Sequence, residues 1–164
     1  MSDELELKKI TPTGLEPAVA RAEHYRLLNQ PRLAQSICFD VLEIDPDNRR
    51  ALVTLVLAMT DEFAASGASA NEARRYASQI DDEYQRHYYA GIIAERVGRA
   101  ALSRPAGAAM AYQALSEAMD HFEKAESLRP EGNDDAILRW NACARTIKEA
   151  HLRPPPPDEP QLLE

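Results

Sequence analysis

Cysteine is scarce in this sequence of 164 residues: Cys38 and Cys143 are the only two, and they form no C-x-x-C pair. Both stand in apolar, helically patterned stretches, which favours buried free thiols over a disulfide or a metal site. The first residues lack the charged and apolar regions of a secretory signal. No run approaches the roughly eighteen apolar residues that a membrane span needs. These absences predict a cytoplasmic protein that does not cross a membrane.

Positively charged residues are fewer than negatively charged ones. The 19 lysines and arginines stand against 27 aspartates and glutamates, which gives a formal net charge of -8. Nucleic-acid backbones and anionic membranes attract basic surfaces, so this balance argues against both as the main partner. A protein partner of basic or mixed charge is expected instead.

Catalytic and metal-binding motifs are missing. The 4 histidines lack zinc-protease spacing, and no nucleophile elbow, dinucleotide-binding or P-loop pattern occurs. The nearest approach to a metal pair is Glu117 with His121, which is typical of a helix surface because two ligands do not make a catalytic zinc site. The acidic run 81–83 is typical of a helix start, where carboxylates oppose the helix dipole. We expect no enzyme activity, no cofactor and no metal.

What the chain does carry is helical periodicity interrupted by prolines and turn residues. Pro17 suits a first helical turn, and Pro46, Pro130 and Pro154 each end a helix. Asn71 is expected to cap the fourth helix. The pattern predicts seven helices, at about 15–28, 33–45, 49–63, 71–80, 81–103, 108–129 and 134–151. Residues 1–14 are expected to form a flexible leader, 15–151 one helical domain, and 152–164 a proline-rich disordered tail.

The first two helices carry small, aromatic and proline residues at Ala22, Tyr25, Ala34, Val41 and Pro46. This spacing resembles the tetratricopeptide repeat (TPR) family. Matching residues recur in the fifth and sixth helices, at Gly91, Ala94, Gly98, Ala118, Phe122, Ala125 and Pro130. The resemblance covers about residues 15–151. It implies an all-α, right-handed superhelix of three antiparallel hairpins followed by a C-terminal capping helix.

Two departures from the family pattern concern the later hairpins. The middle hairpin has a longer loop and no closing proline. The third has roughly fifteen extra residues compared with the 34-residue period, which are expected to lengthen both of its helices. Leu102, Met110 and Tyr112 lie near the tip of this projection, which is either a contact for a dimer or another protein, or simply packs over the capping helix.

In the TPR family the first helix of each hairpin lines a concave groove that receives a segment of a partner protein. The resemblance therefore implies a partner-binding groove made of Glu23, Arg26, Arg50, Thr54, Leu57, Gln85, Tyr88, Tyr89, Ile92, Glu95 and Arg96. Mixed charge and adjacent tyrosines suit a peptide ligand, although for each tyrosine taken singly packing between hairpins is the favoured role. A clamp for a terminal carboxylate is not implied, because Val19 and Glu23 occupy the first clamp positions.

The function that the resemblance implies is a non-catalytic adaptor or scaffold that binds a segment of a partner protein. An alternative is a small dimeric chaperone of the type III secretion kind, or a structural subunit of a larger assembly. The tail that begins at Arg153 is either a polyproline ligand or a solvated spacer. The residues leave the identity of the partner, the oligomeric state and the pathway open.

Overall fold

The structure is a computed structural model that describes residues 4–66 and 70–157. Regular structure in these two stretches is helical throughout, without a strand, so the predicted all-α class is confirmed. The elements are η1 (Pro12–Gly14), α1 (Leu15–Leu27), α2 (Pro31–Ile44), α3 (Arg49–Thr60), α4 (Phe63–Ser66), α5 (Ala70–Ala77), α6 (Glu83–Leu102), α7 (Ala108–Leu128) and α8 (Asp135–Glu149).

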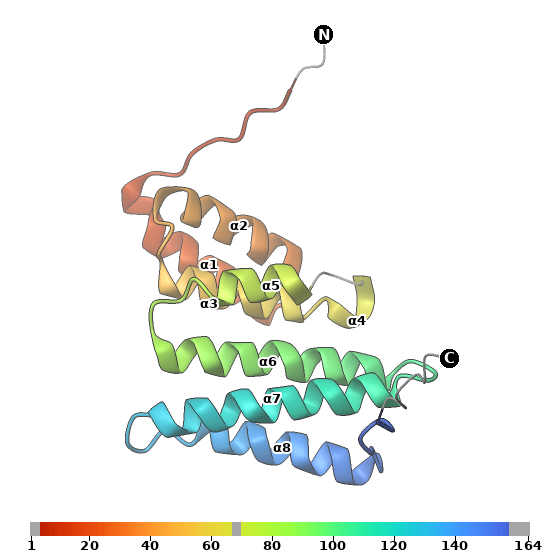
Figure 1. Cartoon of the computed structure of the whole chain (residues 1–164). Helices are drawn as coiled ribbons and strands as arrows, with labels where there is room; N and C mark the ends of the chain where they lie inside the picture. The colour runs from red at the N-terminus through yellow and green to blue at the C-terminus, as the bar shows by residue number, and fades with distance from the viewer. Residues whose placement is uncertain (1–3, 67–69, 158–164) are drawn as a thin grey trace, which may run out of the picture.

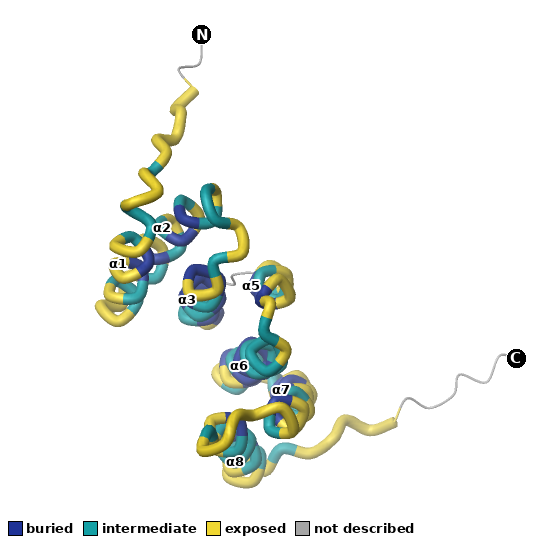
Figure 2. Tube along the Cα trace, turned by 90° about the vertical axis from the view of Figure 1, so that its left-hand side faces the viewer, coloured by how far each residue is buried: buried dark blue, intermediate teal, exposed yellow. Residues whose placement is uncertain are grey.

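The longer helices pack in chain order, each on the one before it: α2 on α1, then α3, α5, α6, α7 and α8. Figure 1 shows them stacked as rods, with α1 and α2 at one end of the stack and α8 at the other. Figure 2 views the helices nearly end-on. There α1, α3, α6 and α8 follow one side, which we call the inner face, and α2, α5 and α7 follow the other, the outer face.

Side-chain caps fix where two of the inner-face helices begin. Asn48 Oδ1 accepts a hydrogen bond from the Ala51 N–H at the start of α3 (3.0 Å). Asp82 Oδ1 accepts one from the Gln85 N–H at the start of α6 (2.8 Å). Each bond satisfies a backbone donor that has no partner within the helix. The acidic run 81–83 therefore serves as a helix start, as the sequence indicates.

The segment after α3 differs from the prediction. Helix α3 ends at Thr60 rather than at Phe63, and Phe63 begins the short helix α4, which takes up part of the expected loop 64–70. Phe63 is buried in the cluster that includes Met59 and Ile93. Burial of this ring draws the segment against the core, a tertiary effect that local periodicity does not reveal.

The start of α5 is also corrected. The helix begins at Ala70, so Asn71 lies within its first turn and is not its N-cap. The Asn71 side chain instead accepts a hydrogen bond from Arg74 (3.0 Å), one turn further along the same helix. The rest of the expected loop, residues 67–69, lies outside the described residues.

Close approach of α6 to α7 depends on glycine. A Cβ atom added at Gly91 would lie 2.5 Å from Phe122 Cε1, and one added at Gly98 would lie 2.8 Å from Leu115 Cγ. Phe122 and Leu115 are themselves fully buried. The two glycines thus leave the space that these side chains fill, which gives a physical reason for the small residues noted in the sequence.

Gly91→Ala is expected to destabilise the protein. Alanine favours a helix over glycine by about 1 kcal/mol, but overpacking against Phe122 costs about 1–3 kcal/mol. We expect a net loss that thermal denaturation followed by circular dichroism detects as a fall of a few degrees. Phe122→Leu in the Gly91→Ala background is the control, and it should recover part of the loss because it relieves the clash. A rise in melting temperature for Gly91→Ala would contradict this packing.

The two cysteines are buried far from each other, Cys38 on α2 and Cys143 on α8. Burial raises the pKa of each thiol from 9.0 to about 12. At pH 8 the thiolate fraction falls to roughly one in ten thousand, and the thiolate is the reactive form.

Both thiols should therefore resist alkylation in the folded protein. Mass spectrometry after iodoacetamide treatment at pH 8 should find both unmodified in buffer and both modified in denaturant. Rapid labelling of either cysteine without denaturant would be inconsistent with this burial.

Candidate partner-binding face

A hollow of about 410 Å³ lies on the inner face where α1, α3 and α6 meet. Of the predicted groove residues, it is lined by Glu23, Arg26, Arg50, Thr54, Leu57, Gln85 and Tyr89. Leu27, Arg49 and Val53 complete the lining. Leu27, which is 79% exposed, is absent from the prediction although it follows Glu23 by one helical turn. The helical repeat is the signal that would have found it.

Ion pairs hold the arginines of this hollow. Arg50 on α3 contacts Glu16 and Glu23 on α1, with 2.6 Å between Arg50 Nη2 and Glu23 Oε1. Arg26 Nε lies 2.9 Å from Asp61 Oδ2, and Arg96 Nη2 lies 3.9 Å from Asp61 Oδ1. These pairs join α1, α3 and α6 and orient the guanidinium groups. Since the Arg50 side chain is still 49% exposed, it can donate to a further ligand as well.

A second hollow, of about 530 Å³, continues the inner face between α6 and α8. Its lining consists of Tyr88, Glu95, Arg96, Arg99, Asp135, Leu138, Arg139 and Ala142. At its base Glu95 is only 2% exposed and pairs with Arg99 Nη2 at 3.0 Å and with Arg139 Nη1 at 2.9 Å. One buried carboxylate thus positions two partly exposed arginines. Arg99 Nη1 also donates to Thr146 Oγ1 at 3.4 Å, and other N–H groups of the two arginines can donate to a carboxylate or carbonyl ligand.

Three tyrosines of α6 pack against other aromatic rings, and two of them also line the hollows. The Tyr84 and Tyr88 rings stack with centroids 5.8 Å apart, and Tyr88 meets Tyr89 edge-on at 5.2 Å and Phe122 at 5.9 Å. Burial raises the pKa of Tyr84 and of Tyr89, so both stay neutral near pH 7. These ring contacts lie within α6 or between α6 and α7. Tyr89 and Tyr88 also reach the first and second hollow respectively.

Some predicted groove residues lie deeper than the register implies. Ile92 is 2% exposed and belongs to the core cluster around Phe122, so its placement in the groove is corrected. Thr54, at 5% exposed, and Glu95 are also buried, although each borders a hollow. Helical register identifies the correct side of a helix, but the depth of a side chain depends on how closely the neighbouring helices approach.

The predicted projection is long but does not form one exposed apolar tip. Helices α6 and α7 cover 20 and 21 residues, so the extra residues do lengthen both, and Figure 1 shows their joining turn on the right, beyond the start of α5. Met110 is 53% exposed. Leu102 and Tyr112 are partly buried, which reduces the apolar surface that a dimer contact needs. A role in docking stays a prediction.

No protein-family model matches the sequence. Comparisons with curated proteins and with solved structures also give no significant match. The TPR family assignment therefore stays a prediction that rests on the residues quoted above.

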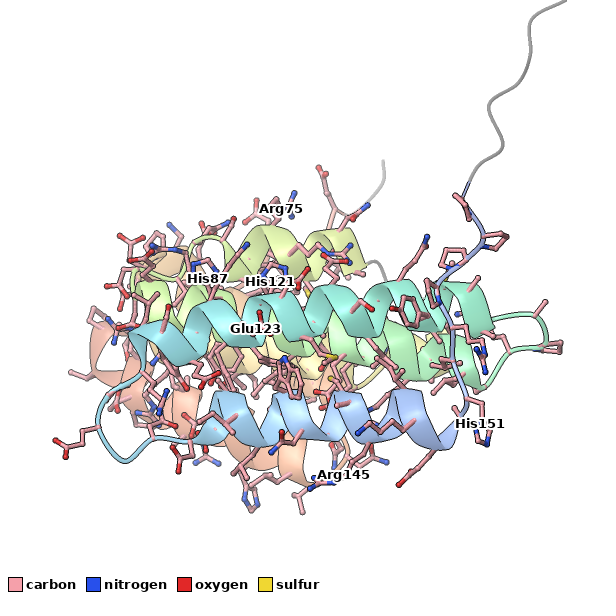
Figure 3. The ribbon with its side chains drawn as sticks, turned by 60° about the horizontal axis from the view of Figure 1, so that its bottom comes forward. Arg75, His87, His121, Glu123, Arg145 and His151 are labelled. Carbon is pink, nitrogen blue, oxygen red and sulfur yellow. The ribbon has the colours of Figure 1, made fainter. Side chains whose placement is uncertain are left out.

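Helix α7 carries the pair of Glu117 and His121 considered in the sequence. Figure 3 shows His87 on α6 and His121 on α7 as neighbours, with ring centroids 6.4 Å apart. Glu117 Oε1 lies 3.6 Å from His121 Nε2, as a helix-surface pair would. Across residues 4–66 and 70–157, no group of three or more histidine, cysteine or acidic side chains could hold a metal ion. Within the same stretches no helix is both long and apolar enough to span a membrane.

Proposed function

We propose that this chain is a non-catalytic, TPR-like scaffold of the cytoplasm whose inner face binds an extended segment of a partner protein. The observation that carries the proposal is the pair of hollows along α1, α3, α6 and α8. Tyr88 and Tyr89, adjacent on α6, contribute to one hollow each. An extended segment that crosses α6 can therefore contact both.

The chemistry of this face suits a peptide that carries carboxylates and apolar side chains. Arg50, Arg99 and Arg139 are oriented by acidic partners and remain partly exposed, so binding need not order them first. An exposed leucine borders each hollow: Leu27, at 79%, the first, and Leu138, at 63%, the second. The exposed leucines provide apolar contact area for the peptide, and the oriented arginines between them can bind its carboxylates in a bidentate manner.

To test the proposal, peptides that bind the full chain are first selected from a random displayed library. Fluorescence anisotropy then gives their affinities for a triple variant of the inner face, Arg50→Ala, Tyr88→Ala and Tyr89→Ala. We expect at least a tenfold loss of affinity, because the variant removes one charged and two aromatic contacts.

The matched control removes an arginine and an aromatic ring from the outer face. Arg75→Ala with Phe39→Ala should change the affinity less than twofold. Circular dichroism should show unchanged helicity for both variants. Equal binding of the selected peptides to the wild-type chain and to the inner-face variant would show that the inner face is not the binding site.

A further inference from the structure

A third hollow, of about 450 Å³, lies between α7 and α8 and shares no lining residue with the two inner-face hollows, so it is separate from them. It is lined by Tyr112, Ser116, Met119, Asp120, Glu123, Trp140, Ala144, Ile147 and Lys148. Trp140 is partly buried, and its indole N–H donates to Glu123 Oε1 at 3.1 Å. The hollow thus combines aromatic and aliphatic walls with two carboxylates.

The same chain carries a segment with complementary chemistry. Beyond α8, Leu152 packs against the core cluster that includes Phe122 and Cys143, as Trp140 and Ile147 also do. The next residues, Arg153 and the four prolines 154–157, are all exposed. Consecutive prolines favour the polyproline II helix, which pays little entropy on binding and docks in aromatic-lined grooves.

We propose that Arg153–Pro157 of a second copy of this chain docks in the α7–α8 hollow. The prolines would lie on Tyr112 and Trp140, and the Arg153 guanidinium would pair with Asp120 and Glu123. The lengths agree. Eleven helical steps from Tyr112 to Glu123 cover about 16 Å at 1.5 Å per residue, and five polyproline II residues cover about 15 Å at 3.1 Å per residue.

Charge sets the direction of the docked segment. Trp140 is bonded to Glu123, which places the two carboxylates toward the Trp140 end of the hollow. Because α8 runs antiparallel to α7, Lys148 lies toward the Tyr112 end. Lys148 repels Arg153, so the arginine occupies the Trp140 end and the last proline the Tyr112 end.

The chain's own tail does not serve as the occupant. Leu152 is already packed at the end of α8, and a run of prolines cannot make the immediate reversal that docking on the same chain requires. Figure 3 shows the tail leaving beside His151, whereas Glu123 lies well away from it along α7. Reciprocal exchange of tails between two copies closes a symmetric dimer and leaves the inner face of each copy free. This inference therefore does not depend on the proposed partner binding.

Trp140 is the only tryptophan of the chain, so its fluorescence reports on the hollow directly. Sedimentation equilibrium and tryptophan emission are measured on the full chain over the same concentration series. We expect the mass to approach twice that of the monomer as the emission shifts. Alanine at positions 154–157 should abolish both changes, and Asp120→Asn, which leaves the Trp140–Glu123 bond in place, should raise the dissociation constant about tenfold.

A peptide of residues 152–157 provides the competing probe. It should shift the Trp140 emission and dissociate the dimer, and a control peptide with alanine in place of the four prolines should do neither. A dimer that persists with alanine at 154–157 would overturn the proposal, as would a monomer at every concentration. Peptide binding by a chain that stays monomeric would show instead that the hollow takes the segment of another protein, which rules out the second copy as the occupant.

Discussion

Phe122→Ala is expected to lower the free energy of unfolding by about 3–5 kcal/mol, as truncation of a fully buried phenylalanine does. The Phe122 ring is 0% exposed and fills the space above Gly91, where it also meets Tyr88. Its loss leaves a cavity between α6 and α7, the most extensively packed pair of helices. In a chain of this size the melting temperature should fall by roughly 10–15 °C, which thermal denaturation followed by circular dichroism measures.

Phe39→Ala is the matched control, because Phe39 is 41% exposed on α2 and contacts Tyr76 with ring centroids 6.1 Å apart. The same truncation should cost only about 1–2 kcal/mol there, since the ring is only partly buried and its loss leaves no enclosed cavity. Similar losses for the two variants would show that Phe122 does not fill a close-packed contact between α6 and α7.

The second large effect concerns the buried carboxylate beneath the α6–α8 hollow. Glu95 is 2% exposed, and removing both of its partners with Arg99→Ala and Arg139→Ala leaves this buried carboxyl group without its ion pairs. Breaking a buried pair in this way costs about 3–5 kcal/mol. Urea denaturation at pH 7 should show the loss as a lower midpoint with an unchanged slope.

A rescue variant shows whether the loss of stability comes from the unpaired buried carboxylate or from the lost packing of the two arginine side chains. Glu95→Leu added to the double variant replaces the stranded carboxylate by an apolar side chain and should recover most of the stability. Arg49→Ala with Arg50→Ala is the surface control. Its ion pairs are exposed and should contribute only about 0–1 kcal/mol each. If Glu95→Leu restored nothing, uncompensated charge would not be the cause of the loss.

Much of the helix order is predictable because its signals are local. Prolines and turn residues act within one or two turns, so helices such as α2, α7 and α8 lie close to their expected ranges. The deviations occur where a distant contact decides the structure. Phe63 forms α4 because the core holds its ring, and Asn71 loses its capping role because α5 begins one residue earlier than expected.

The candidate site was predictable in outline for the same reason. Helical register places Arg50 and Thr54 on one side of α3, and Gln85 and Tyr89 on one side of α6, since side chains three or four positions apart share a side. It does not show that Ile92 is buried, that Asp61 joins Arg26 to Arg96, or that α7 and α8 enclose a hollow around Trp140. Those facts depend on the separation and pairing of helices, which periodicity does not encode.

The most direct test of the central claim is photo-crosslinking to the selected peptides. A benzophenone amino acid is placed at Leu27, an exposed leucine of the inner face, and in a second protein at Leu33, a leucine of α2 on the outer face that is 41% exposed. If the inner face binds the partner segment, mass spectrometry finds the peptide joined at position 27 and not at position 33. Adducts at position 33 alone, or in equal yield at both positions, would contradict the account.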